Sequence, residues 1–355
     1  MSAAATDPRP VLITGGAGFI GANLADALAA AGHRVIVYDA LTRPGVARNL
    51  TWLQSRHGER IEPVVADIRD GGRVADCAAR AQAVFHFAAQ VAVTTSLTDP
   101  RDDFEVNIAG TLGLLEALRT RAPATPLIFA STNKVYGDLG DMAFSLEGDA
   151  YVPDDPALAA NGVGEDRPLD FHTPYGCSKG AADQYVLDYA RSFGMRTAVL
   201  RMSCIYGQRQ MGTEDQGWVA HFLIRALERQ PITLYGDGCQ VRDILDVSDA
   251  VAAYRAAWSR IETVGGRAFN LGGGPANAVS LRRLLGHIGA LLGRPVEVDY
   301  ADWRAGDQRY FVADTRAATA ALGLGARVPW RDGVARLAHW LAAERGLPLA
   351  RDAAE

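Results

Sequence analysis

Short apolar runs of strand length alternate with Ala- and Leu-rich stretches of helix length along the chain up to Arg201. This alternation is typical of a parallel β-sheet with helices on its faces. The apolar runs predict six strands, at Val11–Thr14, Val35–Tyr38, Val64–Ala66, Val84–Phe87, Leu127–Ala130 and Thr197–Leu200. The stretches between them predict helices at Ile20–Ala31, Arg73–Arg80, Asp102–Arg119 and Cys177–Phe193. We therefore predict an α/β fold with a doubly wound parallel sheet.

The regular alternation fades after Arg201, and turn signals then separate shorter segments. Three further helices are predicted there, at Ser248–Trp258, Leu281–Leu292 and Asp332–Ala343. We expect residues 1–201 to form the first domain and residues 202–355 to form mainly a smaller mixed α/β substrate-binding lobe. Residues 1–10 are expected to be a loose tail. Residues 138–174, rich in Pro and acidic side chains, are expected to be a long active-site loop.

Composition limits the classes of function. The 355 residues are 48% hydrophobic and carry a formal charge of −5, so nothing attracts the chain to nucleic acid or acidic lipid. The longest uncharged runs are too polar to cross a membrane, and the first ten residues lack the features of a signal peptide. The four cysteines never approach CxxC spacing and the seven histidines are scattered. We expect free thiols, a cytoplasmic location and no metal site.

A glycine-rich turn follows the first predicted strand and opens the first predicted helix. A helix that starts here directs free N–H groups and the positive end of its dipole at a pyrophosphate, and only glycine lets the backbone approach so closely. This pattern predicts a Rossmann-type, dinucleotide-binding first domain. Its predicted cofactor contacts are Gly15, Gly18, Phe19, Ile20 and Gly21.

Asp39 ends the second predicted strand and completes the dinucleotide pattern. A carboxylate at this place accepts hydrogen bonds from both adenosine ribose hydroxyls and repels a 2′-phosphate, so NAD is favoured over NADP. The ends of the third and fourth strands should also contact the cofactor. The residues expected there are Asp67 and Ile68 near the adenine, and Ala88, Ala89 and Gln90 under the pyrophosphate.

Tyr175 and Lys179 stand four residues apart on one predicted helix, which places both side chains on the same face. A tyrosine with a pKa near ~10 is a poor base at neutral pH, but a neighbouring ammonium and a positive nicotinamide both favour its phenolate. Thr132 ends a predicted strand and offers a hydroxyl that holds a substrate oxygen. We expect Thr132, Tyr175 and Lys179 to be catalytic, with Tyr175 and Lys179 also contacting NAD.

These motifs, together with Val135–Gly137, resemble the extended short-chain dehydrogenase/reductase superfamily of nucleotide-sugar enzymes over nearly the whole chain. Longer stretches resemble the CDP-paratose (CDP-tyvelose) 2-epimerase family more narrowly. They are Gln90–Ser96, Ser131–Asp138, Leu169–Tyr189 and Asp215–Val219. The resemblance implies an isomerase with bound NAD and a nucleotide-diphosphate sugar as substrate. It also implies a homodimer or homotetramer, because relatives pair the helices that correspond to Asp102–Arg119 and Cys177–Phe193.

The two residues after Thr132 bear on the type of reaction. Relatives that dehydrate the sugar carry an acidic pair there, and decarboxylating relatives retain a glutamate. This chain has Asn133 and Lys134, which supply no carboxylate and are expected to orient substrate hydroxyls, or else to form an exposed turn pair. An unactivated sugar C–H is too weakly acidic for direct proton abstraction. Inversion therefore requires transient oxidation to a ketone and return of the hydride to the other face.

The resemblance also implies the substrate contacts. Arg242 and Arg309 match positions where relatives clamp the diphosphate, a task suited to the planar guanidinium. The other expected substrate contacts are Thr95, Tyr206, Arg209, Gln216 and Trp218. Met202, Cys204 and Cys239 depart from the family's pattern and leave the sugar and the base open. We expect 2-epimerisation of a CDP-hexose; the alternatives are a UDP-sugar 4-epimerase of the same fold and a catalytically silent NAD-binding regulator.

Overall fold

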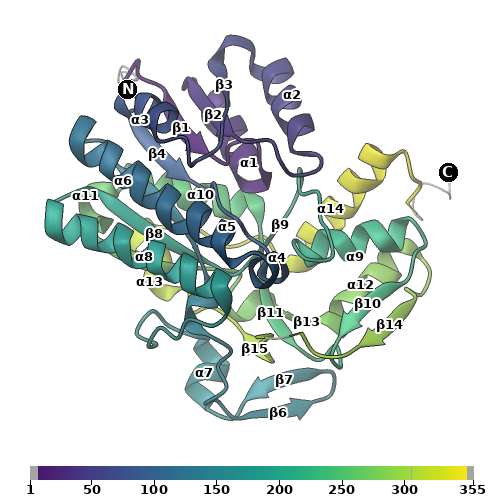
Figure 1. Cartoon of the computed structure of the whole chain (residues 1–355). Coiled ribbons are helices and arrows are strands. Elements are labelled where there is room, and N and C mark those ends of the chain that lie inside the picture. The colour runs from purple at the N-terminus through teal and green to yellow at the C-terminus, as the bar shows by residue number, and fades with distance from the viewer. Residues whose placement is uncertain (1–6, 305, 350–355) are drawn as a thin grey trace.

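The computed structural model describes residues 7–304 and 306–349, and its centre is a seven-stranded parallel sheet (Figure 1). In sheet order the strands are β3 (Ile61–Val65), β2 (Val35–Asp39), β1 (Val11–Thr14), β4 (Ala83–His86), β5 (Leu127–Thr132), β8 (Thr197–Met202) and β12 (Arg267–Leu271). Each neighbouring pair runs parallel. The predicted α/β, Rossmann-type fold with a doubly wound sheet is confirmed.

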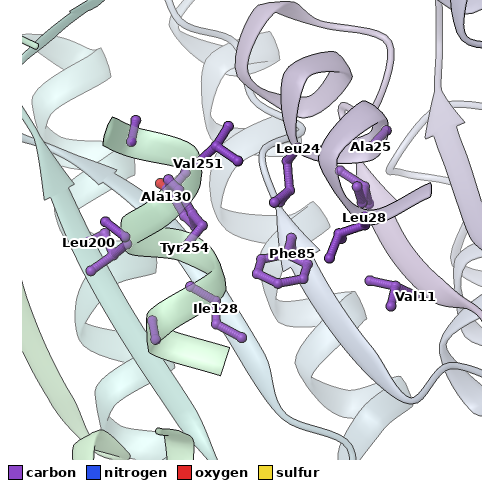
Figure 2. Close-up of a cluster of buried hydrophobic side chains, with 14 of the residues drawn as sticks. Val11, Leu24, Ala25, Leu28, Phe85, Ile128, Ala130, Leu200, Val251 and Tyr254 are labelled. Atoms are coloured by element: carbon purple, nitrogen blue, oxygen red, sulfur yellow. The ribbon is translucent and has the colours of Figure 1, made fainter. Parts of the chain in front are cut away.

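Helices cover both faces of this sheet, which is why β1, β4 and β5 are buried at every position and mostly apolar. One face carries α1 (Phe19–Ala30), α2 (Val46–His57), α10 (Val247–Ser259), α11 (Ile261–Val264) and α13 (Arg316–Leu322). The other carries α3 (Gly71–Ala79), α6 (Gly110–Arg121) and α8 (Thr173–Phe193). Figure 2 shows part of the first layer, where Leu24 and Leu28 of α1 approach Phe85 of β4, with Tyr254 of α10 beside them.

The single helix predicted over Asp102–Arg119 consists of three pieces. They are α5 (Pro100–Phe104), a π-helical turn (Glu105–Ala109) and α6. A π turn adds one residue to the helix and rotates the side chains that follow, and such turns are frequent at functional sites. Here it buries the polar side chain of Asn107, whose contacts are described with the site.

The C-terminal lobe has its own core, built on α9 (Trp218–Leu227), α12 (Leu281–Leu292) and α14 (Trp330–Arg345). Its strands are β9 (Cys204–Tyr206), β10 (Ile232–Tyr235), β11 (Val241–Asp246), β13 (Ala278–Ser280), β14 (Val298–Ala301) and β15 (Tyr310–Phe311). They form a parallel β10–β14 pair and a mixed sheet in which β11 pairs antiparallel with β13 and parallel with β9 and β15. Figure 1 shows α9, α12, β10 and β14 together on the right of the molecule.

Part of the chain after Arg201 returns to the first layer. β12 completes the central sheet beside β8, where α13 packs on it, and α10 covers the sheet at β5. The sequence pattern did not predict β12 because this strand lies at the edge of the sheet and begins with an exposed Arg267. The third strand is also displaced, from the predicted Val64–Ala66 to Ile61–Val65, where exposed positions interrupt the apolar pattern.

Residues 138–174 contain regular structure. A β6–β7 hairpin (Phe144–Glu147 and Ala150–Pro153) and the short α7 (Pro156–Asn161) lie at the bottom of Figure 1. Residues 1–6 of the expected tail lie outside the described residues. In the rest of that tail, the carbonyls of Asp7 and Arg9 accept hydrogen bonds from Gln82. Within the described part of the chain, no helix has the length and apolar character that a membrane crossing requires.

His86 at the end of β4 is fully enclosed between two hydroxyls. Its Nδ1 lies 2.6 Å from Oγ1 of Thr14 and its Nε2 lies 3.0 Å from Oγ1 of Thr111. Burial, aided by the charge of Lys179, lowers the pKa of His86 to about 3. The imidazole is therefore neutral in the folded protein at neutral pH.

This neutral histidine makes stability depend on pH. The folded-state pKa lies below the unfolded value of about 6.5, so the stabilising contribution is complete above pH 6.5 and falls as the pH drops towards 3. We expect it to fall by about 1.4 kcal/mol per pH unit. Urea unfolding of wild type and His86→Gln at pH 7 and pH 5 measures this, and the variant should lose less stability over the interval. Equal losses in the two proteins would contradict the assignment.

Candidate active site

The turn between β1 and α1 has the geometry of an anion cradle. Gly15 adopts a φ of +68°, and a Cβ there would lie 2.7 Å from the backbone N of Ala88. Gly18 caps α1 without a side-chain hydrogen bond, so the first N–H groups of the helix have no side-chain acceptor. Such groups bind phosphate oxygens. The turn therefore fits the pyrophosphate of a dinucleotide.

Asp39 lies at the rim of this cradle. One carboxylate oxygen accepts a hydrogen bond from the backbone N of Ala17 at 3.0 Å, and the other accepts one from Leu41 at 2.9 Å. Burial raises the pKa of Asp39, while these backbone hydrogen bonds and the charge of Arg43 oppose the rise. The carboxylate is thus held in one orientation beside the glycine-rich turn, as ribose recognition requires.

The other predicted cofactor residues follow the ends of β3 and β4. Ala88 lies against Gly15, and its backbone N approaches Oγ1 of Thr14 at 3.4 Å. Ala89 follows it in the same turn. Asp67 forms a two-pronged ion pair with Arg69, with Nε–Oδ1 and Nη2–Oδ2 distances of 2.9 and 2.6 Å.

Ile68, the other residue expected near the adenine, has its side chain in the core. It is buried beneath α6, where a Cβ on Gly110 would lie 2.9 Å from its side chain.

Thr132 and Tyr175, far apart in sequence, are brought together at the end of β5. Tyr175 lies in the first turn of α8, and its backbone N is 3.2 Å from Oγ of Ser96 on α4 (Val93–Thr98). Burial raises the pKa of Tyr175 to about 12, and a hydrogen bond with Thr132 opposes that rise. The sequence led us to expect a lowered pKa. Desolvation of the buried phenol is the largest cause of the opposite shift.

Lys179 lies one helical turn after Tyr175 and is almost completely buried. Its Nζ is 4.2 Å from the centroid of the Phe129 ring, a cation–π contact. Burial lowers the pKa of Lys179 to about 7, against the charges of Asp183 and Asp103. The Phe129 ring and these carboxylates favour the ammonium form of Lys179, one helical turn after Tyr175.

Asn107 connects the catalytic helix to the cofactor side, a role that sequence reasoning missed. Its Nδ2 donates to the carbonyl of Gln90 at 3.0 Å and to Oγ of Ser178 at 2.9 Å, and its Oδ1 accepts from the backbone N of Gln90 at 2.9 Å. Gln90 also donates its side-chain amide to Asp103 at 2.9 Å. No local motif marks Asn107, because only the π turn directs it inward.

Asn133 and Lys134 form the start of a one-turn 3-10 helix, Asn133–Tyr136. Nζ of Lys134 donates to the carbonyl of Gly306 at 3.1 Å, and burial lowers its pKa to about 8. Nδ2 of Asn133 donates to Oε1 of the fully buried Gln308 at 3.2 Å. Both side chains are therefore held by the C-terminal lobe beside Thr132, and they do not form an exposed turn pair.

Arg242, like Lys134, contacts the turn of the C-terminal lobe that holds Gly306 and Asp307. Its Nη2 lies 2.7 Å from Oδ1 of Asp307, and its charge acts on both Lys134 and Cys204. Trp218 lies next to Cys204, and its indole N donates a hydrogen bond to Sγ of Cys204 at 3.3 Å. Asp307 and Gln308 were not predicted as site residues.

The structure corrects three predicted substrate contacts. Tyr206 is fully buried in the core of the lobe, and its hydroxyl points to the carbonyl of Trp330 at 3.4 Å. Arg209 lies over the rings of Trp52 and Trp340, with its Cζ 4.0 and 5.4 Å from their centroids. It therefore joins α2 to α14.

Arg309 lies over the ring of Tyr151, with its Cζ 5.4 Å from the centroid. Its backbone carbonyl accepts a hydrogen bond from the backbone N of Val241 at 3.0 Å, and its side chain is exposed. Gln216 closes a tight turn with Thr213 ahead of α9. Thr95 is exposed on α4. Over the described ranges, no cluster of three or more His, Cys, Asp or Glu side chains has the arrangement of a metal site.

The position of Asp39 predicts the choice of cofactor. Asp39→Ala should weaken NAD binding by about 10- to 100-fold, the usual cost of losing hydrogen bonds to a charged group, and should reduce the preference over NADP. Titration of both cofactors into cofactor-free protein measures this. Asp76→Ala, a change on the exposed side of α3, is the matched control. Equal affinity of the unmodified protein for NAD and NADP would refute the role of Asp39.

Comparison with known proteins agrees with this geometry. The model of the NAD dependent epimerase/dehydratase family matches residues 11–272. The CDP-paratose 2-epimerase of Salmonella typhi is 42% identical over 337 residues, which cover 93% of this chain and 98% of that protein. A dTDP-glucose 4,6-dehydratase of Xanthomonas campestris is 31% identical, with 93% of this chain and 92% of that one covered.

Among solved structures, the UDP-glucose 4-epimerase of Thermotoga maritima with UDP-glucose superposes with a TM-score of 0.81. It is 29% identical in sequence and covers 95% of this chain and 99% of that one. Sequence and structure thus agree on the same group of enzymes across almost the whole length. The chain belongs to the NAD-dependent epimerase/dehydratase family, and NAD is its cofactor.

Proposed function

We propose that this protein is a nucleotide-sugar 2-epimerase that acts on a CDP-linked hexose. The observation that carries the proposal is the pair Asn133 and Lys134, held beside Thr132 by Gln308 and Gly306. Elimination of water needs an acid and a base next to the reacting sugar, and this pair supplies no carboxylate there. Oxidation followed by reduction at one carbon needs neither. The 42% identity to a CDP-paratose 2-epimerase supports C2 as that carbon.

The proposed reaction begins with the proton of the C2 hydroxyl. Tyr175 receives it, with Thr132 positioned to hold the same substrate oxygen, and Lys179 stabilises the phenolate form of the base. NAD, which the glycine-rich turn and Asp39 would hold, would supply the hydride acceptor and donor for C2, so that inversion there needs no other redox partner. Burial raises the pKa of Tyr175 to about 12, and a positive charge nearby, from Lys179 or from a nicotinamide ring, would favour its phenolate.

Between the two half-reactions the sugar ring must turn over while the substrate stays bound. Arg242 can hold the diphosphate for this interval, because its guanidinium is nearly buried and already oriented by Asp307. Asn133 and Lys134 then face the hydroxyls of whichever sugar face is presented.

The four cysteines are free, which supports the proposed reducing, cytoplasmic location.

An isotope experiment tests the proposal. A CDP-hexose deuterated at C2 and turned over in ordinary water should yield a C2-inverted product that keeps its deuterium, read by NMR and mass spectrometry. Exchange of the label with solvent would contradict hydride return, because it indicates proton abstraction beside a carbonyl. Inversion at C4 instead would favour the 4-epimerase alternative, which the 29% identical UDP-glucose 4-epimerase structure keeps open.

Tyr175→Phe is the control for this experiment. It removes the proton acceptor but keeps the ring, and should reduce turnover by about 10²–10⁴-fold with NAD still bound. If the unmodified protein turns over the substrate and the Tyr175→Phe variant does not, the alternative of a catalytically silent NAD-binding regulator is also excluded.

We also propose that the protein forms a homodimer or homotetramer through α8 and its neighbours. The large apolar side chains Phe104, Tyr185 and Phe193 are 53%, 43% and 52% exposed on α5 and α8. Figure 1 shows α5, α6 and α8 running together along one side of the molecule. Two copies that pair these helices would cover the side chains and bury apolar area that a single copy leaves in water.

Light scattering on the purified protein checks the assembly. The mass should be at least twice 37.9 kDa, and Tyr185→Glu together with Phe193→Glu should shift it towards one chain. Leu146→Glu, at an equally exposed apolar position on the β6–β7 hairpin, should leave the mass unchanged. A wild-type mass near 37.9 kDa at micromolar concentration would overturn the proposal.

A further inference from the structure

A flat cation lies on an aromatic ring in the C-terminal lobe, outside the catalytic group. The Cζ of Arg304 is 3.8 Å from the centroid of the Tyr235 ring, at the end of β10. Glu214, in the turn before α9, receives both groups: its Oε1 accepts from the Tyr235 hydroxyl and from Nη2 of Arg304, the latter at 3.2 Å. A planar group on this ring therefore presents N–H donors to a carboxylate at the ring's edge.

This cluster is continuous with the catalytic site. The carbonyl of Arg304 accepts from the backbone N of Asp307 at 3.2 Å, and Asp307 binds Arg242. The carbonyl of Gly306, in the same turn, accepts a hydrogen bond from Lys134, which is two residues after Thr132. A substrate with its sugar at Thr132 and its diphosphate at Arg242 would therefore extend its far end towards Tyr235. In a nucleotide sugar that far end is the base.

Glu214 has the chemistry to distinguish two pyrimidines. The hydrogen bond from Tyr235 and the charge of Arg304 lower the pKa of Glu214, so it is an ionised, acceptor-only group at neutral pH. Cytosine carries an amino donor at the position where uracil carries a carbonyl acceptor, and carboxylates accept from that amino group. Uracil would instead bring two acceptors together.

We propose that Tyr235 and Glu214 form the base-binding slot and select cytosine over uracil, and that the Arg304 guanidinium occupies this slot until a nucleotide displaces it. The inference rests on the proposed function, because it takes a nucleotide sugar as the substrate. It goes further by assigning the selection of the base to Glu214. Tyr235 supplies the stacking surface, which holds either pyrimidine.

Calorimetric titration of the intact protein with CDP and with UDP tests the slot without any turnover. Wild type should bind CDP on the order of tenfold or more tightly than UDP. Glu214→Gln should bring the two affinities close together, because an amide can donate as well as accept. Asp215→Asn, the neighbouring carboxylate, should leave the wild-type ratio unchanged. Tyr235→Ala should weaken both nucleotides by about five- to 100-fold and keep their ratio.

The outcomes separate this inference from the proposed reaction. Equal affinities in wild type, or a ratio that Glu214→Gln does not change, would overturn the slot even if C2 epimerisation is observed. A CDP preference that depends on Glu214 would support the slot even if the reaction proves to invert another carbon. Glu214 is about half exposed, so the variant should fold, and its bound NAD content verifies this.

Discussion

A buried ion pair between Arg201 and Asp183 holds the catalytic helix to the sheet. Nε and Nη2 of Arg201, at the end of β8, each lie 3.0 Å from the carboxylate of Asp183 on α8, one turn after Lys179. Ser131 of β5 donates to the same carboxylate at 2.7 Å, and Tyr136 accepts from Arg201 at 3.0 Å. Removing one partner of such a pair leaves an uncompensated buried charge, which costs about 3–5 kcal/mol. The position of Tyr175 and Lys179 relative to Thr132 depends on this contact.

The parallel sheet explains why the remaining chemistry gathers at one edge. The cradle at Gly15, the carboxylate of Asp39 and the hydroxyl of Thr132 lie at or just after the carboxyl ends of β1, β2 and β5. Burial at this edge has opposite consequences for the two groups on α8. It raises the pKa of Tyr175 to about 12 and lowers that of Lys179 to about 7, because burial disfavours the charged form of each group. In the proposed reaction, a positive charge near Tyr175 would favour its phenolate.

The C-terminal lobe completes the site with one short turn. The carbonyl of Gly306 accepts a hydrogen bond from Lys134, and the carboxylate of Asp307 orients Arg242. The side chain of Gln308 accepts a hydrogen bond from Asn133. The groups that bear on the type of reaction are thus fixed from outside the cofactor domain. Such an arrangement suits a family whose members invert or dehydrate different sugars.

The sequence by itself determined the cofactor turn, Asp39, the Tyr175–Lys179 pair and most of the central sheet, because each depends on local spacing or on strands apolar on both faces. It could not predict β12, an edge strand supplied from beyond residue 201, nor the π turn that directs Asn107 inward. The tertiary structure alone decided which side chains of the lobe meet the site. Arg209 and Arg309 have the chemistry of phosphate ligands, yet long-range packing places their guanidinium groups on aromatic rings elsewhere. Residue type limits what a side chain can bind, and only the packing of distant segments fixes where it lies.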